Sequence, residues 1–143
     1  MQIQFSLLSP NFSNLDIQNL YEERNIQILA YSPLAFGLLA VPPDQSRIPV
    51  TLFRRNIFLL LLPSTKFLRR ELNRLAIDRG VSQAQVALNW CRAHGAMPIP
   101  GIRNSKQVKE AGEASKWILA KREKHVLDRL RENCEVRIPV NPY

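Results

Sequence analysis

The chain has 143 residues, which is enough for one domain with a modest hydrophobic core. With 45% hydrophobic and 22% charged residues, its composition excludes an intrinsically disordered protein. The net charge is +8, but the basic residues alternate with acidic ones, so we expect solvated helix faces and no nucleic-acid partner. The longest apolar run, residues 57–62, is far shorter than the roughly 20 residues that span a bilayer, so we expect no membrane partner.

Two parallel strands joined by a helix are expected at the start of the chain. Residues 3–8 and 26–31 are apolar enough for strands that are covered on both faces. Between them, Asn14 can cap a helix that ends near Asn25. Its apolar face is expected to carry Ile17, Leu20 and Tyr21. A strand, a helix and a strand within about 30 residues form a βαβ unit.

The middle of the chain is expected to be a long loop followed by helices. Residues 32–51 hold several prolines and read as a loop, which at this length is usually functional or disordered. Residues 52–62 fit a short helix, and residues 66–79 fit a clear amphipathic helix that ends at Gly80. The outward face of this second helix is expected to carry Arg69, Arg70, Asn73 and Arg74.

A third strand and further helices are expected in the second half. Ser82 fits the N-cap of a helix that ends near residue 93, and a short apolar strand follows at residues 97–99. A helix over residues 105–115 can be capped by Asn104 or Ser105. The last helix is expected to bury Val126, Leu127 and Leu130, and residues 136–143 should form an extended tail on the surface.

The turn after the third strand is a place for a phosphate. Gly101 lies between a strand and a helix N-terminus, where backbone N–H groups are free. Arg103 and Lys106 bring positive charge to the same point. The pattern therefore predicts an anion site at residues 101–106.

Cysteines and histidines predict no chemistry of their own. Cys91 and Cys134 are too few for a disulfide framework or a metal site, and Cys91 reads as a buried apolar residue. His94 and His125 are expected on helix surfaces, with no catalytic role. No signal peptide is visible at Met1, so we expect a soluble protein of the cytoplasm. For a full-length parent protein, a plastid is the alternative location.

Four segments together resemble the aldo-keto reductase family. They are residues 2–8 (QIQFSLL), 28–34 (ILAYSPL), 86–90 (VALNW) and 98–101 (PIPG), in the family's order and spacing. The resemblance implies an α/β fold: a partial (β/α)8 TIM barrel made of the last three βα units, strands six to eight, plus a C-terminal helix. Residues 1–143 would form the C-terminal portion of such a domain, with strands near 3–8, 26–31 and 97–100 and with helices on one face.

The resemblance also implies NADP(H) as the cofactor. The residues that would contact it are Gln2, Tyr31, Ser32, Leu34, Gly37, Arg103, Asn104, Gln107 and Glu110. Gln2 would hold the nicotinamide carboxamide, and the ring of Tyr31 would stack on the nicotinamide. Ser32, Leu34 and Gly37 would follow the pyrophosphate.

At the other end of the dinucleotide, Arg103 and Asn104 would face the 2′-phosphate and ribose, and Gln107 and Glu110 would reach the adenosine. The sequence departs from the family where Glu110 is followed by Ala111 and not by Asn. Two plainer interpretations stay open, in which Tyr31 is a core aromatic residue and Arg103 is a solvated loop cation.

The family's catalytic Asp, Tyr, Lys and His lie on its first four strands and have no counterpart here. We therefore expect a cofactor-binding portion that is inactive alone, with no catalytic residue and no metal. The alternative is a non-catalytic nucleotide-binding or interaction protein derived from such a barrel. Open strand edges, and inner faces expected to carry Ile3, Phe5, Ile28 and Ala30, predict self-association or binding of a complementary barrel fragment.

Overall fold

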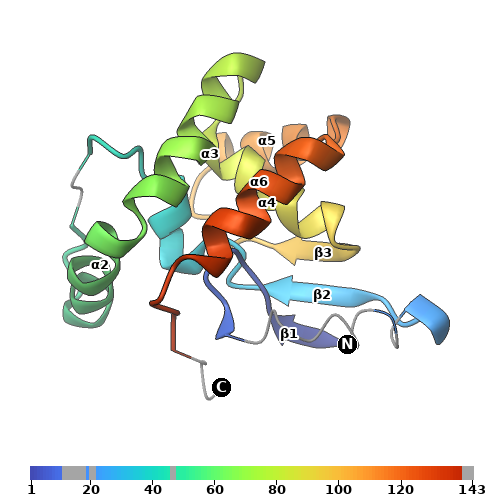
Figure 1. Ribbon diagram of the computed structural model, residues 1–143, viewed down its shortest axis with the longest axis horizontal. Coiled ribbons are helices and arrows are strands. Elements are labelled where there is room, and N and C mark those ends of the chain that lie inside the picture. Colours follow the sequence, from blue (N-terminus) through green and yellow to red (C-terminus); the bar gives the residue numbers. More distant parts are fainter. Residues whose placement is uncertain (11–18, 20–21, 46–47, 140–143) are drawn as a thin grey trace.

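The computed structural model, which describes residues 1–10, 19, 22–45 and 48–139, contains a three-stranded parallel sheet with helices on one face (Figure 1). The strands are β1 (Gln2–Gln4), β2 (Ile28–Tyr31) and β3 (Ala96–Ile99), in the spatial order β1-β2-β3. Both neighbouring pairs are parallel, which confirms the predicted strand order and direction. Of the helix expected after Asn14, residues 19, 22 and 23 are described and helical, whereas Ile17, Leu20 and Tyr21 lie outside the described residues.

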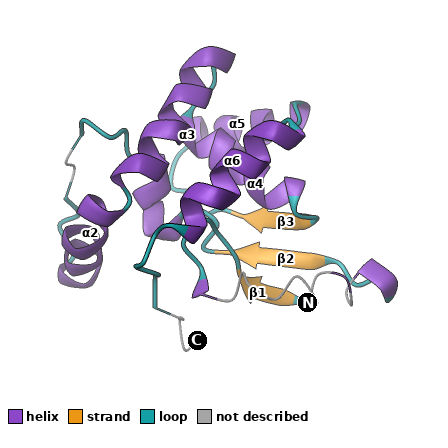
Figure 2. Cartoon of the chain, in the orientation of Figure 1, coloured by secondary structure: helices purple, strands orange, loops and turns teal. Residues whose placement is uncertain are grey.

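Seven helical segments follow β2 in the described part of the chain, and β3 lies between the fourth and the fifth (Figure 2). Their bounds are η2 (Ala35–Ala40), α2 (Leu52–Ser64), α3 (Lys66–Arg79), α4 (Gln83–Ala93), α5 (Ser105–Glu113), η3 (Ala114–Lys116) and α6 (Lys121–Glu132), where η marks a 3₁₀ helix. η3 follows α5 directly. Gly80 ends α3 with a left-handed φ of 64°, as the sequence predicted.

β1 is shorter than the predicted strand over residues 3–8 because two serines turn the chain. The ladder continues one step beyond β1, where the Phe5 N–H donates to the Tyr31 carbonyl at 3.2 Å. The Ser6 N–H then donates to Ser9 Oγ at 2.7 Å, and the Leu8 N–H donates to Ser6 Oγ at 3.2 Å. Side-chain hydroxyls thus replace the strand partners of these backbone groups.

The strand register decides which side chains face the helices. Ile3 is paired with Ala30, and Ala30 with Pro98, so these positions lie on one face of the sheet. Phe5, Ile28 and Ala30 are buried in the core beneath the helices. The expectation that they face the missing half of a barrel is wrong, because the opposite face carries the alternate residues. That open face holds Gln2, Gln4, Leu29, Tyr31, Met97 and Ile99.

The core lies between the sheet and the helices α3, α4 and α6, which Figure 1 shows above it. Trp90 of α4 stacks on Phe5, with ring centroids 5.2 Å apart. Cys91 is buried as predicted, and burial raises the pKa of its thiol. Leu72 of α3 and Leu127 of α6 are also fully buried, so both helices contribute to one core.

Two polar residues lie inside the protein where the sequence placed them on the surface. His94 is buried, and its Nε2 lies 3.0 Å from Asp128 Oδ1, which also accepts the Trp90 indole N–H at 2.8 Å. Burial lowers the pKa of His94, although the hydrogen bond to Asp128 acts in the other direction. Arg69 is buried as well, because its donors bind loop carbonyls. Helical periodicity alone does not reveal such partners.

The C-terminal tail packs against the start of the chain. The Ile138 N–H donates to the Leu8 carbonyl at 3.0 Å, and the Ile138 side chain is buried. The Gln4 amide donates to the Pro139 carbonyl at 3.1 Å. The expected surface position of the tail is therefore wrong for Ile138. Nothing in the described part of the chain is a helix long and apolar enough to cross a bilayer.

Candidate cofactor site

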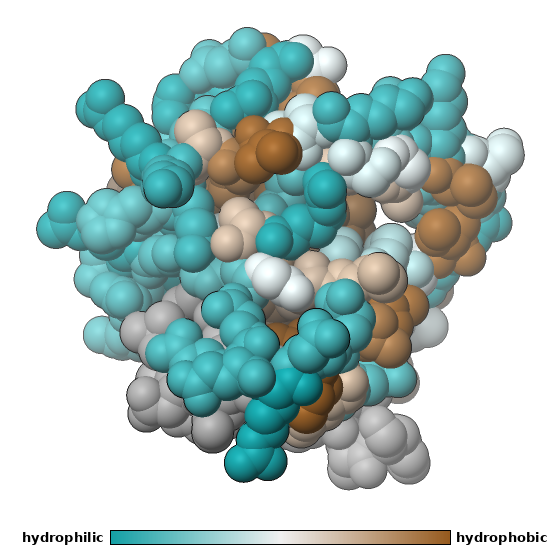
Figure 3. Space-filling view, turned by 90° about the vertical axis from the view of Figure 1, so that its right-hand side faces the viewer, coloured by the Kyte–Doolittle hydropathy of each residue, from teal (hydrophilic) through white to brown (hydrophobic). Residues whose placement is uncertain are grey.

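The candidate site lies where β2 and β3 end, at the left of the sheet in Figure 1. The strands are parallel, so the loops that follow Tyr31 and Ile99 leave the sheet at the same edge. Ligands of parallel α/β folds bind at this edge. Figure 3 shows the opposite edge, where the strands begin, as a mainly hydrophilic surface with separate hydrophobic patches.

The loop after β2 is a tight turn with a left-handed backbone. φ is positive at Ser32 (52°), Ala35 (49°), Phe36 (59°) and Gly37 (94°). Residues other than glycine rarely adopt such angles, and runs of them concentrate at functional sites. The turn closes on itself, because the Gly37 N–H donates to the Leu34 carbonyl at 2.9 Å.

Three polar side chains from the helices bind backbone carbonyls of residues 36–42, which form the end of this turn and the segment that follows it. Arg54 Nη2 donates to the Phe36 carbonyl at 2.6 Å. Gln83 Nε2 donates to the carbonyls of Leu39 and Val41 at 2.8 and 3.1 Å. Arg69 Nη1 donates to the same Val41 carbonyl at 3.3 Å and to that of Pro42 at 3.2 Å. The carbonyls of the turn are thereby satisfied by α2, α3 and α4, and the turn is fixed on rigid elements.

Gly37 is required here on two grounds. Its φ of 94° disfavours any side chain, and an added Cβ would lie 3.2 Å from Arg54 Nη2. The absent side chain therefore leaves the space through which Arg54 reaches the Phe36 carbonyl.

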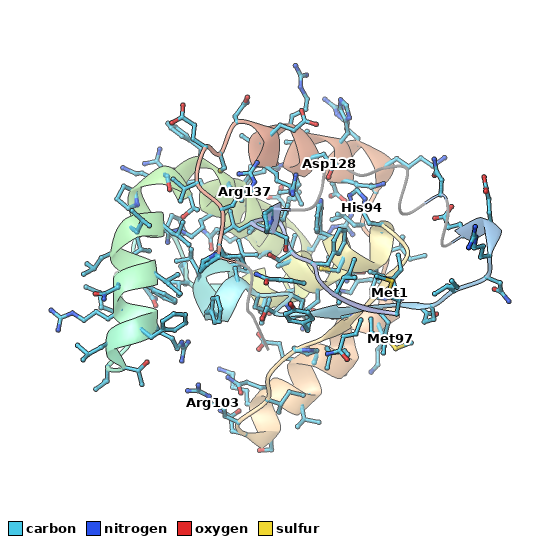
Figure 4. The ribbon with its side chains drawn as sticks, turned by 90° about the horizontal axis from the view of Figure 1, so that it is seen from below. Met1, His94, Met97, Arg103, Asp128 and Arg137 are labelled. Carbon is cyan, nitrogen blue, oxygen red and sulfur yellow. The ribbon has the colours of Figure 1, made fainter. Side chains whose placement is uncertain are left out.

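On the open face of the sheet, Gln2 and Tyr31 lie on neighbouring strands. The register pairs Gln2 with Leu29 and Gln4 with Tyr31, so Gln2 lies two positions closer to the strand starts than Tyr31. Gln2 is exposed and Tyr31 is half-buried. Figure 4 views the molecule from below, and Met97, on the same open face, is visible near the start of β3. A flat ligand on this face could contact both Gln2 and Tyr31.

A reciprocal pair of hydrogen bonds builds the start of α5. Asn104 Oδ1 accepts the backbone N–H of Gln107 at 3.0 Å, which selects Asn104 over Ser105 as the N-cap. Gln107 Oε1 accepts the backbone N–H of Arg103 at 2.8 Å. Both amide side chains thus have positions fixed by the backbone.

The Arg103 guanidinium is exposed and points away from α5 in Figure 4. Within the described ranges it forms no hydrogen bond or ion pair. A free guanidinium beside a helix N-terminus can bind a phosphate dianion through two parallel hydrogen bonds.

Three of the predicted residues meet in one small cavity. A cavity of about 70 Å³ lies between η2, α4 and α5, and Leu34, Gln107 and Glu110 contribute to its wall. Pro100 and Ile102 bring the loop after β3 to the same cavity. The loops after both strands therefore meet at the predicted adenosine end.

Comparison with known proteins identifies the family. The model of the Aldo/keto reductase family matches residues 1–132. The chain belongs to the aldo/keto reductase family. It is 37% identical over 127 residues to pyridoxal reductase, chloroplastic, of Arabidopsis thaliana, an alignment that covers 89% of this chain and 34% of that protein. The aldo-keto reductase AFTS1 of Alternaria alternata is 27% identical over 104 residues, 72% of this chain and 28% of that one.

Solved structures of aldo-keto reductases have the same fold. The glycerol dehydrogenase from Gluconobacter oxydans superposes with a TM-score of 0.77 at 26% identity, covering 99% of this chain and 44% of that one. A thermostable aldo-keto reductase solved with the inhibitor epalrestat gives a TM-score of 0.64 at 18% identity, over 90% of this chain and 38% of the other. The fold thus resembles part of an aldo-keto reductase TIM barrel, and the chain spans less than half of each relative.

Sequence analysis of this aldo-keto reductase chain missed the side chains behind the turn. Arg54, Arg69 and Gln83 come from three different helices and follow no motif in the sequence. The one signal in the sequence is that residues 45–70 hold no acidic residue, so that Arg54 has no carboxylate nearby along the chain.

A second, larger cavity lies along the free edge of β3. Its volume is about 450 Å³, and its wall is mainly apolar, with Leu88, Met97 and Ala111 among the lining residues. None of the predicted cofactor residues of this aldo-keto reductase chain lines it. No group of three or more His, Cys, Asp or Glu within the described residues could hold a metal ion.

Proposed function

We propose that this chain is the NADP(H)-binding portion of an aldo-keto reductase, comprising strands six to eight of its barrel. The observation that carries the proposal is the free guanidinium of Arg103 beside the N-terminus of α5, at the carboxyl edge of the sheet. The cavity of about 70 Å³ that Leu34, Gln107 and Glu110 line would form part of the wall at the adenosine end.

The remaining predicted residues form the other end of this proposed site. Tyr31 presents a half-buried ring on the open face, where stacking on a nicotinamide is favourable. Gln2 would bind the carboxamide from the neighbouring strand. Ser32, Leu34 and Gly37 lie in the tight turn between the two ends, where backbone groups would follow the pyrophosphate.

Titration of NADPH fluorescence tests this proposal. Saturable binding by the wild-type chain that weakens severalfold in Tyr31→Ala is the expected result. Met97→Ala is the matched control, because Met97 lies on the same open face but outside the proposed site. Absence of binding, or equal losses in both variants, would contradict the proposed site.

In this proposal the cofactor supplies hydride, and the residues of this chain only bind and orient it. A full-length parent would reduce small aldehydes or ketones, whereas this chain has no residue in the place of the family's general acid. Purified chain with NADPH and a reactive aldehyde should therefore show no turnover above background. NADPH consumption that disappears in Tyr31→Phe would mean that Tyr31 donates the proton, contrary to the proposal.

A non-catalytic nucleotide-binding or interaction protein is the second candidate. The observation that favours it is the pair of free sheet edges, since β1 and β3 each pair only with β2 among the described residues. A complementary barrel fragment or a second copy would pair with these edges. We place such a protein inside the cell, in the cytoplasm or, as the name of the Arabidopsis relative says of that protein, in a chloroplast.

A further inference from the structure

Helix α2 presents an apolar face to solvent. Its inward residues Ile57, Phe58 and Leu61 are buried in the core. Its outward side holds the exposed Asn56 and, around it at helical spacing, four apolar exposed residues: Leu52, Phe53, Leu59 and Leu60. We call these four residues the outer face of α2. Figure 1 shows α2 at one end of the molecule, and Phe53 also meets the ring of Phe36 in η2 edge to face, with ring centroids 5.8 Å apart.

The segment that contains α2 and the start of α3 is rich in positive charge. Between Asp44 and Glu71 the sequence has no acidic residue, and its cations are Arg47, Arg54, Arg55, Lys66, Arg69 and Arg70. Arg55, Lys66 and Arg70 are exposed, and the described part of the chain offers none of them an ion-pair partner. Arg54 and Arg69 are directed inward, where they bind carbonyls.

The charge and the shape of this face select its partner. A second copy would bring the same cations together, and the chain already carries a net charge of +8. The two cavities described above are lined by other elements and not by residues of α2. An apolar helix face with flanking cations matches the interface of a bilayer that contains anionic lipids.

We propose that the outer face of α2 docks the protein on anionic membrane surfaces. Leu52, Phe53, Leu59 and Leu60 would enter the boundary between headgroups and acyl chains, and Arg55, Lys66 and Arg70 would lie at the level of the headgroup phosphates. The expectation of no membrane partner rested on the short apolar run, and surface binding requires no spanning segment. The proposal is independent of NADP(H) binding.

Each cation that reaches an anionic surface strengthens binding about fivefold. Because exposed charges are screened within about 10 Å at 0.1 M salt, binding should fall steeply as salt rises. The first measurement is therefore cosedimentation of the full wild-type chain with vesicles of phosphatidylcholine alone or with phosphatidylserine added to about 30%. The protein should pellet with the mixed vesicles at least about tenfold more strongly than with phosphatidylcholine. Equal pelleting with both would overturn the proposal.

Two variants locate the binding surface. Leu52→Glu/Leu60→Glu should lose about tenfold or more in binding to the mixed vesicles. The matched control is Ile77→Glu/Ile118→Glu, which adds the same charge at similar exposure: 75% and 67% for Leu52 and Leu60, against 71% and 79% for Ile77 and Ile118. An equal loss in the control would overturn the proposal.

A charge variant keeps the test decisive if the glutamates disturb folding. Arg55→Gln/Lys66→Gln/Arg70→Gln changes only exposed side chains and should reduce the preference for phosphatidylserine about tenfold or more. Lys121→Gln/Arg122→Gln/Arg129→Gln on α6 removes the same charge and should keep it. Sedimentation without lipid completes the design: conversion of a dimer to a monomer by Leu52→Glu/Leu60→Glu would show that a second copy covers the face, which overturns the proposal.

Discussion

Gln107 Oε1 accepts the backbone N–H of Arg103 at 2.8 Å, so the residue proposed to bind the 2′-phosphate is held by the helix that follows it. Asn104 lies between them in the sequence, and its Oδ1 accepts the Gln107 N–H at 3.0 Å. The loop after β3 and the first turn of α5 therefore form one hydrogen-bonded unit.

This unit predicts the cost of removing its cap. Asn104→Ala should lower the free energy of unfolding by about 0.5–2 kcal/mol, because one N–H of the first turn loses its partner. Asn104→Asp should retain most of the stability, since its carboxylate accepts the same bond. Ser105→Ala is the control, as the structure gives the cap to Asn104. Urea denaturation checks this prediction, and a larger loss in Ser105→Ala would refute it.

The stability of the turn after β2 should depend on Gln83. Gln83→Ala leaves the Leu39 carbonyl without this donor and Val41 with Arg69 alone. The expected loss is about 1–3 kcal/mol of unfolding free energy, the usual cost of an unsatisfied buried group. Gln45→Ala, at an exposed loop position, should change stability by less than about 0.5 kcal/mol. Similar losses in the two variants would contradict the role given to Gln83.

His94 predicts a stability that depends on pH. Burial lowers its pKa below the ordinary value of about 6.5, so the unfolded chain binds more protons than the folded one between the two pKa values. The contribution of His94 to the free energy of unfolding should therefore be complete above about pH 6.5 and should decrease as the pH falls below it. The slope for one proton is at most about 1.4 kcal/mol per pH unit.

Denaturation at several pH values separates His94 from other groups. Lys124 and Arg131 also disfavour its charged form, whereas Asp128 favours it. Burial acts to raise the pKa of Asp128, but hydrogen bonds from His94 and Trp90 lower it on balance, so its contribution is lost only in more acidic solution. His94→Gln should abolish the slope between pH 6.5 and 5, and His125→Gln should keep it. An unchanged slope in His94→Gln would exclude His94 as its source.

The strand order and the helix caps were predictable from the sequence because they rest on local signals. Apolar runs predicted the strands, Gly80 predicted the end of α3, and Asn104 was one of two predicted caps. The length of β1 was not predictable in this way, since Ser6 and Ser9 form their bonds through side chains after the backbone has turned. Likewise, helical periodicity predicted an outward Arg69. The prediction was wrong because Arg69 binds carbonyls of a loop that is distant in the sequence.

The faces of the sheet illustrate the same limit. The alternation correctly predicted that Ile28 and Ala30 lie on one face of the sheet, but no local signal indicates whether helices cover that face. The helices cover it, and the open face carries Leu29, Tyr31, Met97 and Ile99. The cofactor residues were assigned through the resemblance to the family and remain predictions.

The free edges of the sheet predict a marginal or self-associating chain. β1 and β3 leave strand N–H and C=O groups open along the described sheet, and Met97 and Ile99 expose apolar surface on its open face. Net stability of a domain is only about 5–15 kcal/mol, and each large apolar side chain left exposed forfeits about 1.5–3 kcal/mol. Sedimentation velocity should show self-association or a need for a partner fragment. A monomer with one cooperative melting transition above about 50 °C would refute this prediction.

The most direct test of the central claim is the affinity of Arg103→Ala for NADPH and NADH. Loss of a charge-assisted hydrogen bond to the 2′-phosphate should weaken NADPH binding by about 1.5–3 kcal/mol. NADH lacks this phosphate, so its affinity should hardly change. Arg122→Ala, an exposed arginine of α6, should leave both affinities unchanged. Fluorescence titration that shows a selective loss for NADPH would support an NADP(H) site at Arg103, whereas equal losses for both cofactors would contradict it.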